Sequence, residues 1–345
     1  MAINKLLYPA AALYGITVKF RNLLFDKGIF RSSEFDVPVI NVGNISAGGN
    51  GKTPHVEYLA SLLLEQNRRI AVLSRGYGRK TKGFREVTAG GTPSENGDEP
   101  LQIKRKFGDE LRVFAGEKRV DAILKIMDTC PDTDVILLDD AFQHRAVKAG
   151  LNLLLTDYNR LFTSDALLPA GRLRERKSGA SRADAIIVTK CPENITEKEK
   201  SAIRQKLEKY CNTVLFSRFE YGKPYGFLNT GKTDTNNNFF VVTGIAKPGP
   251  MIDYAGKNFD IAGIKTFPDH HRFTAKDISG IEKLTADGNK KPAVLTTTKD
   301  AVRFWEIHRK TKFGFPVYVL PVEVKFEKDD EDKFNKMVLD FAGKT

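Results

Sequence analysis

A glycine-rich stretch between a strand and a helix constrains the fold of this chain more than any other segment. Residues 37–43, VPVINVG, form an apolar run typical of a buried strand, and residues 52–65 carry Val56, Leu59 and Leu63 at helical spacing. Between them lies NISAGGNG, whose three glycines let backbone N–H groups turn inward around phosphate oxygens. A strand, a glycine-rich loop and a helix in this order are the context that a phosphate-binding P-loop requires.

The loop supplies the candidate nucleotide-binding residues, which are Ser46, Ala47, Gly48, Gly49, Asn50, Gly51, Lys52 and Thr53. Lys52 can reach the β- and γ-phosphates of a nucleotide, and the Thr53 hydroxyl can bind Mg²⁺. The strict pattern expects a glycine at position 46, where this chain has serine. The alternative is a glycine-rich turn that binds no nucleotide. The preceding strand and the intact Gly-Lys-Thr favour the P-loop.

A second strand ends in two carboxylates. Residues 135–140, VILLDD, are four apolar residues followed by Asp139 and Asp140, an arrangement that places a carboxylate near Mg²⁺ at the carboxyl edge of a parallel sheet. Gln143 and His144 follow at the same edge. Such strands are common, and an ordinary surface residue is the alternative for His144. Together with the P-loop, the strand predicts a site for a nucleotide and its metal.

Apolar runs alternate with helical patterns along the chain, which indicates βαβ units and a parallel sheet. A polar, glycine-rich stretch at 220–238 marks a domain boundary, and a further α/β unit follows it. We predict an N-terminal helical region over 1–30, a P-loop core domain over 31–220, and a smaller α/β domain over 221–345. Within the last, 317–326 is expected to form one closing strand and 328–342 a final helix.

Charge and the N-terminus point to an anionic partner. Lysine and arginine number 55 against 43 acidic residues, for a net charge of +12. Residues 6–17 carry no charge and are flanked by Lys5, Lys19 and Arg21, which predicts a basic amphipathic helix in a membrane interface. A helix packed into the core is the alternative. The basic residues form no aromatic-interleaved platform, so nucleic acid is not expected. The three cysteines form no CxxC pair, which excludes a cysteine-rich zinc site.

A P-loop specifies a nucleotide but not a reaction. A kinase also needs a group that takes the proton of the acceptor hydroxyl. Acids, bases and cations that could complete such a site occur in three further segments: GDEP at 97–100, PDHHRF at 268–273 and LPAGRLRER at 168–176. Taken singly, each is explained better by ordinary turn, helix-cap or solvated surface chemistry.

The ordered set of motifs resembles the tetraacyldisaccharide 4'-kinases, the lipid A 4'-kinases. The matching segments are VGNISAGGNGKTP (42–54), SRGYG (74–78), GDEP (97–100), DDAFQHR (139–145), LPAGRLRE (168–175), TGIAKP (243–248), FPDHHRF (267–273) and TTTKDAVRF (296–304). The resemblance implies transfer of phosphate from ATP, with Mg²⁺, to the 4'-hydroxyl of a tetraacylated glucosamine disaccharide 1-phosphate, giving lipid IVA. It also implies two α/β/α units joined by a short β linker.

The resemblance further implies roles for individual residues. Lys52 and Thr53 would bind the ATP phosphates and Mg²⁺ with Asp139 or Asp140, and Glu99 would assist the metal. Asp98 and His270 would act together as a base dyad. The expected substrate-binding residues are Arg119, Gln143, His144, Arg174 and Glu175.

The expected partners are the acylated lipid and an anionic membrane surface, with no obligate protein partner. The expected location is the cytoplasmic face of the inner membrane of a Gram-negative bacterium. The alternative function is a membrane-peripheral P-loop ATPase or switch protein with a protein partner.

Overall fold

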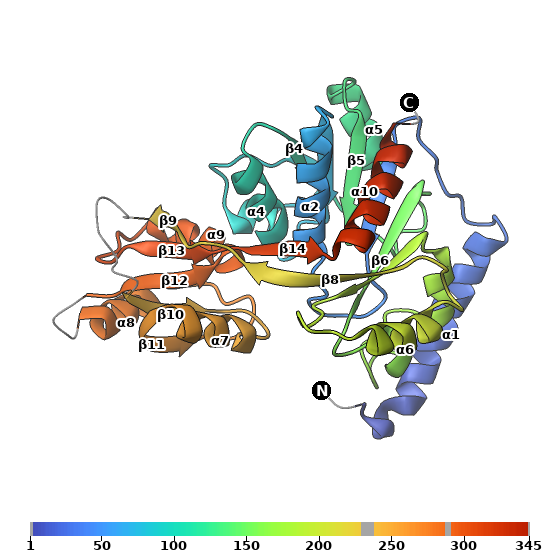
Figure 1. Ribbon diagram of the computed structural model, residues 1–345. Helices are drawn as coiled ribbons and strands as arrows, with labels where there is room; N and C mark the ends of the chain where they lie inside the picture. The colour runs from blue at the N-terminus through green and yellow to red at the C-terminus, as the bar shows by residue number, and fades with distance from the viewer. Residues whose placement is uncertain (1–2, 229–237, 287–290, 344–345) are drawn as a thin grey trace.

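Two β-sheets lie next to each other in the computed structural model, which describes residues 3–228, 238–286 and 291–343. Each sheet is covered by helices on both faces, and two long strands, β8 and β14, run between the two units (Figure 1). We call the larger sheet with its helices the large lobe, and the smaller sheet with its helices the small lobe. The mixed α/β architecture predicted from the sequence is confirmed.

The large sheet contains nine strands within the described residues, in the order β14-β8-β7-β6-β1-β5-β2-β4-β3. Their bounds are β1 Val39–Gly43, β2 Ile70–Ser74, β3 Arg85–Glu86, β4 Arg112–Ala115, β5 Val135–Asp139, β6 Leu151–Asp157, β7 Ala185–Thr189, β8 Val214–Tyr221 and β14 Val322–Phe326. The strands from β8 to β4 are parallel, and β14 and β3 pair antiparallel at the edges. Their apolar runs are buried on both faces, as parallel strands covered by helices require.

The helices of this lobe are α1 Tyr8–Asp26, α2 Lys52–Glu65, α3 Pro93–Asn96, α4 Asp98–Phe107, α5 Arg119–Thr129, α6 Glu197–Leu207 and α10 Lys328–Ala342, with short 3-10 turns at Lys5–Leu7, Phe162–Ser164 and Lys177–Arg182. α2, α4 and α10 contribute apolar side chains to the core on one face of the sheet. α5 and α6 pack on the other face. The segment between β2 and α4 contains β3 and α3 and leads directly into α4.

The small sheet has the order β11-β10-β12-β13-β9 among the described residues. Its elements are β9 Tyr225–Leu228, β10 Asn238–Thr243, α7 Gly249–Asn258, β11 Asp260–Thr266, α8 Ala275–Ala286, β12 Ala293–Thr297, α9 Thr298–His308 and β13 Val317–Leu320. α8 and α9 cover one face of the sheet, and α7 covers the other. The predicted boundary stretch 220–238 includes 229–237, which lie outside the described residues.

The C-terminal part of the chain differs from the sequence-based prediction. Residues 317–326 form two strands in different sheets, with Pro321 between them. Proline has no N–H to give to a ladder and tends to end a strand. β13 therefore closes the small sheet, whereas β14 and α10 return to the large lobe, where Phe334 and Val338 are fully buried. The predicted division assigns all residues after 220 to the smaller domain, whereas β14 and α10 belong to the large lobe.

The N-terminal helix α1 lies along the outside of the large lobe (Figure 1). Ala11 and Gly15 are its buried residues, and a Cβ at Gly15 would lie 2.6 Å from Leu167 Cδ1. No helix in the described part of the chain is long and apolar enough to cross a membrane.

Candidate active site

The phosphate loop follows β1 and leads into α2, as the sequence predicts. Gly48 and Gly51 have positive φ values of 119° and 84°, which only glycine adopts readily. The side chain of Lys52 points back along the loop, with Nζ 3.4 Å from Asn44 Oδ1 and 3.7 Å from Asp140 Oδ2. Thr53 follows in the first turn of α2. The free N–H groups of that turn and the loop glycines form an anion-binding end of the helix.

The loop is braced by residues that the sequence analysis did not assign to the site. Thr189 Oγ1, at the end of β7, donates to the Asn50 carbonyl at 3.0 Å, and the Lys190 ammonium donates to the Gly49 carbonyl. Lys190 is in turn paired with Asp157, 3.1 Å away. A Thr-Lys pair directly after a strand was the available signal, because the carboxyl ends of neighbouring parallel strands share one edge of the sheet.

Asp139 and Asp140 lie at the end of β5, directly beside β1, since Val42 pairs with Asp139. Burial, and then the charges of Asp140 and Glu99, raise the pKa of Asp139 to about 7. Burial alone would raise the pKa of Asp140 as well, but Lys52 and Arg174 lower it below its usual value. Arg174 Nη2 lies 2.7 Å from Asp140 Oδ1. The surroundings therefore shift the pKa values of the two neighbouring carboxylates in opposite directions.

The acidic residues fit a magnesium ion held together with nucleotide phosphates. Asp139 Oδ1 is buried and has no hydrogen-bond partner in the described part of the chain, so one carboxylate oxygen is unengaged beside the P-loop. Within residues 3–228, 238–286 and 291–343, no three acidic, His or Cys side chains form a metal cluster. Mg²⁺ usually takes one or two carboxylates and completes its shell with phosphates and water. Asp139, Asp140 and Thr53 would hold the ion here, with Glu99 nearby.

The predicted dyad is brought together across the two lobes. Asp98 is the first residue of α4 in the large lobe, and His270 lies in the loop after β11 in the small lobe. His270 Nδ1 is 3.1 Å from Asp98 Oδ2, although 172 positions separate them in sequence. Burial would raise the pKa of Asp98, but hydrogen bonds from His270 and Arg303 lower it to about 2. The pair is thus an ionised carboxylate against an imidazole.

Three predicted substrate-binding residues, Arg119, His144 and Arg174, lie close to the carboxylates. Arg119 is buried, and its Nε and Nη2 have no hydrogen-bond partner among the described residues. Burial lowers the pKa of Arg119 to about 10. Burial, and then the charges of Arg119 and Arg75, lower the pKa of His144 to about 4, so this imidazole is neutral at pH 7. Arg174, described above with Asp140, also donates to the Asn44 carbonyl at 2.8 Å.

Glu175 and Gln143 connect α1 to the site instead of facing an open surface. Glu175 is completely buried and accepts hydrogen bonds from Gln143 (2.8 Å), Arg182 (2.8 Å) and Asn22 of α1 (3.3 Å). Its carboxylate is thus engaged by protein groups, and the direct contact with substrate expected from the sequence stays a prediction. The motif residue is explained by its packing: it anchors the N-terminal helix beside the phosphate loop.

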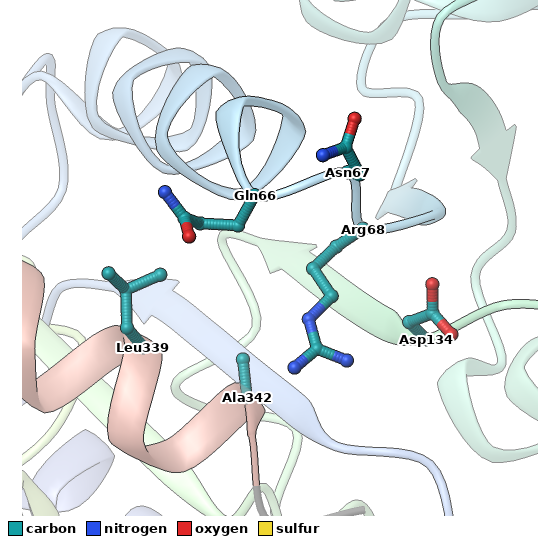
Figure 2. A pocket seen from close by; sticks show the side chains of 6 residues that line it. All are labelled: Gln66, Asn67, Arg68, Asp134, Leu339 and Ala342. Atoms are coloured by element: carbon teal, nitrogen blue, oxygen red, sulfur yellow. The ribbon is translucent and has the colours of Figure 1, made fainter.

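A surface pocket of about 300 Å³ lies away from these residues (Figure 2). It is lined by Gln66, Asn67, Arg68, Asp134, Leu339 and Ala342. Arg68 and Asp134 precede β2 and β5, so the pocket is at the amino ends of the strands, opposite the phosphate loop. Ligands of parallel α/β sheets bind at the carboxyl ends. The candidate active site is therefore the P-loop edge.

Comparison with known proteins agrees with this geometry. The family model for tetraacyldisaccharide-1-P 4'-kinase matches residues 3–342. The tetraacyldisaccharide 4'-kinase of Phocaeicola vulgatus is 42% identical to the chain, over 99% of this chain and 96% of that protein. The tetraacyldisaccharide 4'-kinase of Porphyromonas gingivalis is 44% identical, over 96% of this chain and 95% of that protein. The crystal structure of the "apo" form of LpxK from Aquifex aeolicus in complex with ATP superimposes with a TM-score of 0.74 at 30% identity, over 97% of this chain and 98% of that one. The chain therefore belongs to the tetraacyldisaccharide-1-P 4'-kinase family.

Proposed function

We propose that the chain transfers the γ-phosphoryl group of ATP to the 4'-hydroxyl of a tetraacylated glucosamine disaccharide 1-phosphate, giving lipid IVA for lipopolysaccharide. One observation supports this most directly: an Asp–His pair from two lobes, Asp98 and His270, in a chain with a P-loop and paired carboxylates. A P-loop ATPase that acts on a protein partner needs no such pair for an acceptor hydroxyl. Family membership agrees with the kinase.

Each group has a distinct part in this reaction. ATP would supply the phosphoryl group and Mg²⁺ the neutralising charge, and Thr53, Asp139 and Asp140 would hold the ion. Lys52 neutralises charge on the transferring phosphate. The Asp98–His270 pair orients the sugar hydroxyl and takes its proton. Because the pair is formed between the lobes, lobe closure would also exclude water and limit ATP hydrolysis.

The exposed face of α1 supports action at a membrane surface. Leu13, Ile16, Phe20 and Leu23 of α1 are all at least 40% exposed and follow one another at helical spacing, and the exposed Leu6 precedes them in the 3-10 turn. The opposite face is fixed to the site, for example by the Tyr14 hydroxyl, which donates to the Arg174 carbonyl at 2.7 Å. With a net charge of +12, such a helix suits an anionic bilayer that contains the lipid substrate. We place the enzyme at the cytoplasmic face of the inner membrane.

A transfer assay tests the reaction. The chain is incubated with γ-labelled ATP, Mg²⁺ and the tetraacylated disaccharide 1-phosphate in mixed micelles, and the lipids are separated. We expect label in a new bisphosphorylated lipid. No label should enter a matched lipid whose 4'-position already carries phosphate, or appear when Lys52→Ala replaces the wild-type chain. ADP release without labelled lipid would favour the ATPase or switch protein.

The membrane role is tested on the exposed stripe and not by deletion, because the inner face of α1 holds site residues. Ile16→Ser with Phe20→Ser should weaken flotation with anionic vesicles and lower activity on lipid in bilayers, while activity in micelles changes little. Leu124→Ser is the matched control, since Leu124 is 54% exposed on α5, outside the stripe. Unchanged flotation of the double variant would contradict the membrane role.

A further inference from the structure

The segment TTTKDAVRF, residues 296–304, is part of the family resemblance, but no role was assigned to it above. It forms the end of β12 and the start of α9. Thr297 caps the helix, with its Oγ1 3.0 Å from the Asp300 backbone nitrogen. α9 packs against α4 of the large lobe, which begins with Asp98.

The guanidinium of Arg303 bonds to both lobes at once. Its Nε lies 3.0 Å from Asp98 Oδ2, and its Nη2 donates to the same oxygen. On the small-lobe side, Nη1 donates to the Gly244 carbonyl at 3.2 Å and to Asp300 Oδ1 at 2.9 Å. The Arg303 side chain is only 3% exposed. A planar guanidinium that is buried and bonded on both sides has little freedom to move.

The small-lobe partners of Arg303 are also fixed. Asp300 is completely buried and accepts hydrogen bonds from Thr243 Oγ1 and the Gly244 N–H, both at 2.9 Å. The Gly244 carbonyl that accepts from Arg303 also accepts the His270 N–H at 3.2 Å. The same loop residue therefore anchors the arginine and the histidine, and the arginine reaches across to the carboxylate.

The neighbours of the imidazole define which ring nitrogen faces Asp98. His270 Nε2 lies 3.0 Å from the Lys299 ammonium. Nδ1 is 3.1 Å from Asp98 Oδ2 and 3.2 Å from Arg303 Nη2, so this ring nitrogen faces the carboxylate and the guanidinium together. This arrangement requires Asp98 Oδ2 at one defined position, which Arg303 holds with two N–H groups.

We propose that Arg303 is a positioning residue of the Asp98–His270 pair, holding the large-lobe carboxylate in register with the small-lobe imidazole. The proposal rests on the phosphoryl-transfer function proposed above. The simpler alternative is a salt bridge that only joins the lobes. α9 already has an apolar attachment to the large lobe, because Val302 is buried in the same core cluster as Leu101 and Ile103 of α4. Docking of α9 therefore does not depend on Arg303 alone.

Kinetic measurements distinguish a role of Arg303 in positioning Asp98 from a role in joining the two lobes. Arg303→Gln should lower kcat at least tenfold with the KM for ATP changed less than about twofold, because the phosphate loop does not contact Arg303. In an Asp98→Ala background, the same substitution should lower kcat less than about twofold, since residues that act as a unit are not additive. Arg309→Gln is the matched control: Arg309 also bridges the lobes, at 3.2 Å to the Gly90 carbonyl, but lies away from the dyad. It should leave kcat unchanged.

A measurement without substrate distinguishes failure of this inference from failure of the proposed function. In chain with ¹⁵N-labelled histidine, Arg303→Gln should shift the ring nitrogen signals of His270 and leave those of His55 in place. Arg303→Lys keeps the positive charge but not the planar guanidinium group, and should show a smaller shift of the His270 signals and an intermediate kcat. It also serves if the glutamine variant does not fold.

The outcomes are distinct. Shifted His270 signals in a chain that labels no lipid would retain the positioning role and reject the proposed function. Unshifted His270 signals, an unchanged kcat in folded Arg303→Gln or Arg303→Lys, or a full loss that persists in the Asp98→Ala background would each overturn the positioning role.

Discussion

The phosphate loop and the Asp98–His270 pair show two ways of building half of one active site. The loop is one continuous strand–loop–helix segment, residues 39–65, whose geometry is set locally by glycine and helix-terminus chemistry. The pair joins residues 172 positions apart, from two different lobes. The first half is thus specified mainly within one segment of the large lobe, where Thr189 and Lys190 also brace it. The second exists only while the lobes keep their relative position, so it is the half that motion or substitution between the lobes can disassemble.

The largest expected effect is on the local half. Lys52→Ala should lower kcat about a thousandfold, or about 4 kcal/mol, because the ammonium stabilises charge on the transferring phosphate. The thermal unfolding midpoint should change little. The measurement is the transfer assay on a variant whose circular dichroism matches the wild type. Turnover near the wild-type rate in a folded variant would remove the P-loop from the mechanism.

Gly51→Ala tests whether the phosphate loop is as local as its sequence suggests. Gly51 has φ 84°, and a Cβ there would lie 2.5 Å from Cζ of Phe219 on β8, one of the strands between the lobes. Left-handed backbone and overpacking together should lower the free energy of unfolding by about 3 kcal/mol.

The double variant Gly51→Ala/Phe219→Leu separates the backbone contribution to this loss of stability from the packing contribution. Urea unfolding should show that it regains the packing part and retains the backbone part. If Phe219→Leu gives no recovery, the loop is independent of β8 and its geometry is set entirely within the segment.

A smaller effect concerns His55, which ties α2 to β8. Its Nε2 lies 3.0 Å from Ser217 Oγ. Burial lowers the pKa of His55 to about 4, against 6.5 in the unfolded chain. Between these pH values the unfolded chain binds a proton that the folded chain does not. The free energy of unfolding therefore rises with pH in this range, and this contribution to stability decreases as the pH falls below 6.5.

His55→Gln should reduce the difference in unfolding free energy between pH 7 and pH 4.5 by roughly 2 kcal/mol. Urea titrations at the two pH values measure it. Some dependence should remain, because the pKa of His144 is also lowered to about 4. An undiminished pH dependence in the variant would assign the effect to other groups.

The same contrast explains what could be predicted from the sequence. The helix expected over 52–65 is α2, and the strand expected before the paired carboxylates is β5, because these features depend on local periodicity and loop chemistry. The pairing of Asp98 with His270 came from family resemblance, since no local pattern encodes a contact between lobes.

The misplaced features have similar physical reasons. Glu175 carries a charge typical of a functional residue, and nothing near it in sequence shows that it is completely buried and bonded to Gln143 and Arg182. Arg303 is an ordinary helix residue until the lobes are placed together. Pro321, in contrast, was a visible signal that residues 317–326 are two strands.

The central claim is that the base is one unit assembled from two lobes. The direct test is kcat for Asp98→Ala, for His270→Ala and for the double variant, with ATP affinity measured separately on each. We predict that each single substitution lowers kcat strongly, that ATP affinity changes little, and that the double variant loses much less than the product of the two single losses. Fully multiplicative losses would contradict the claim, because they would mean that Asp98 and His270 act independently.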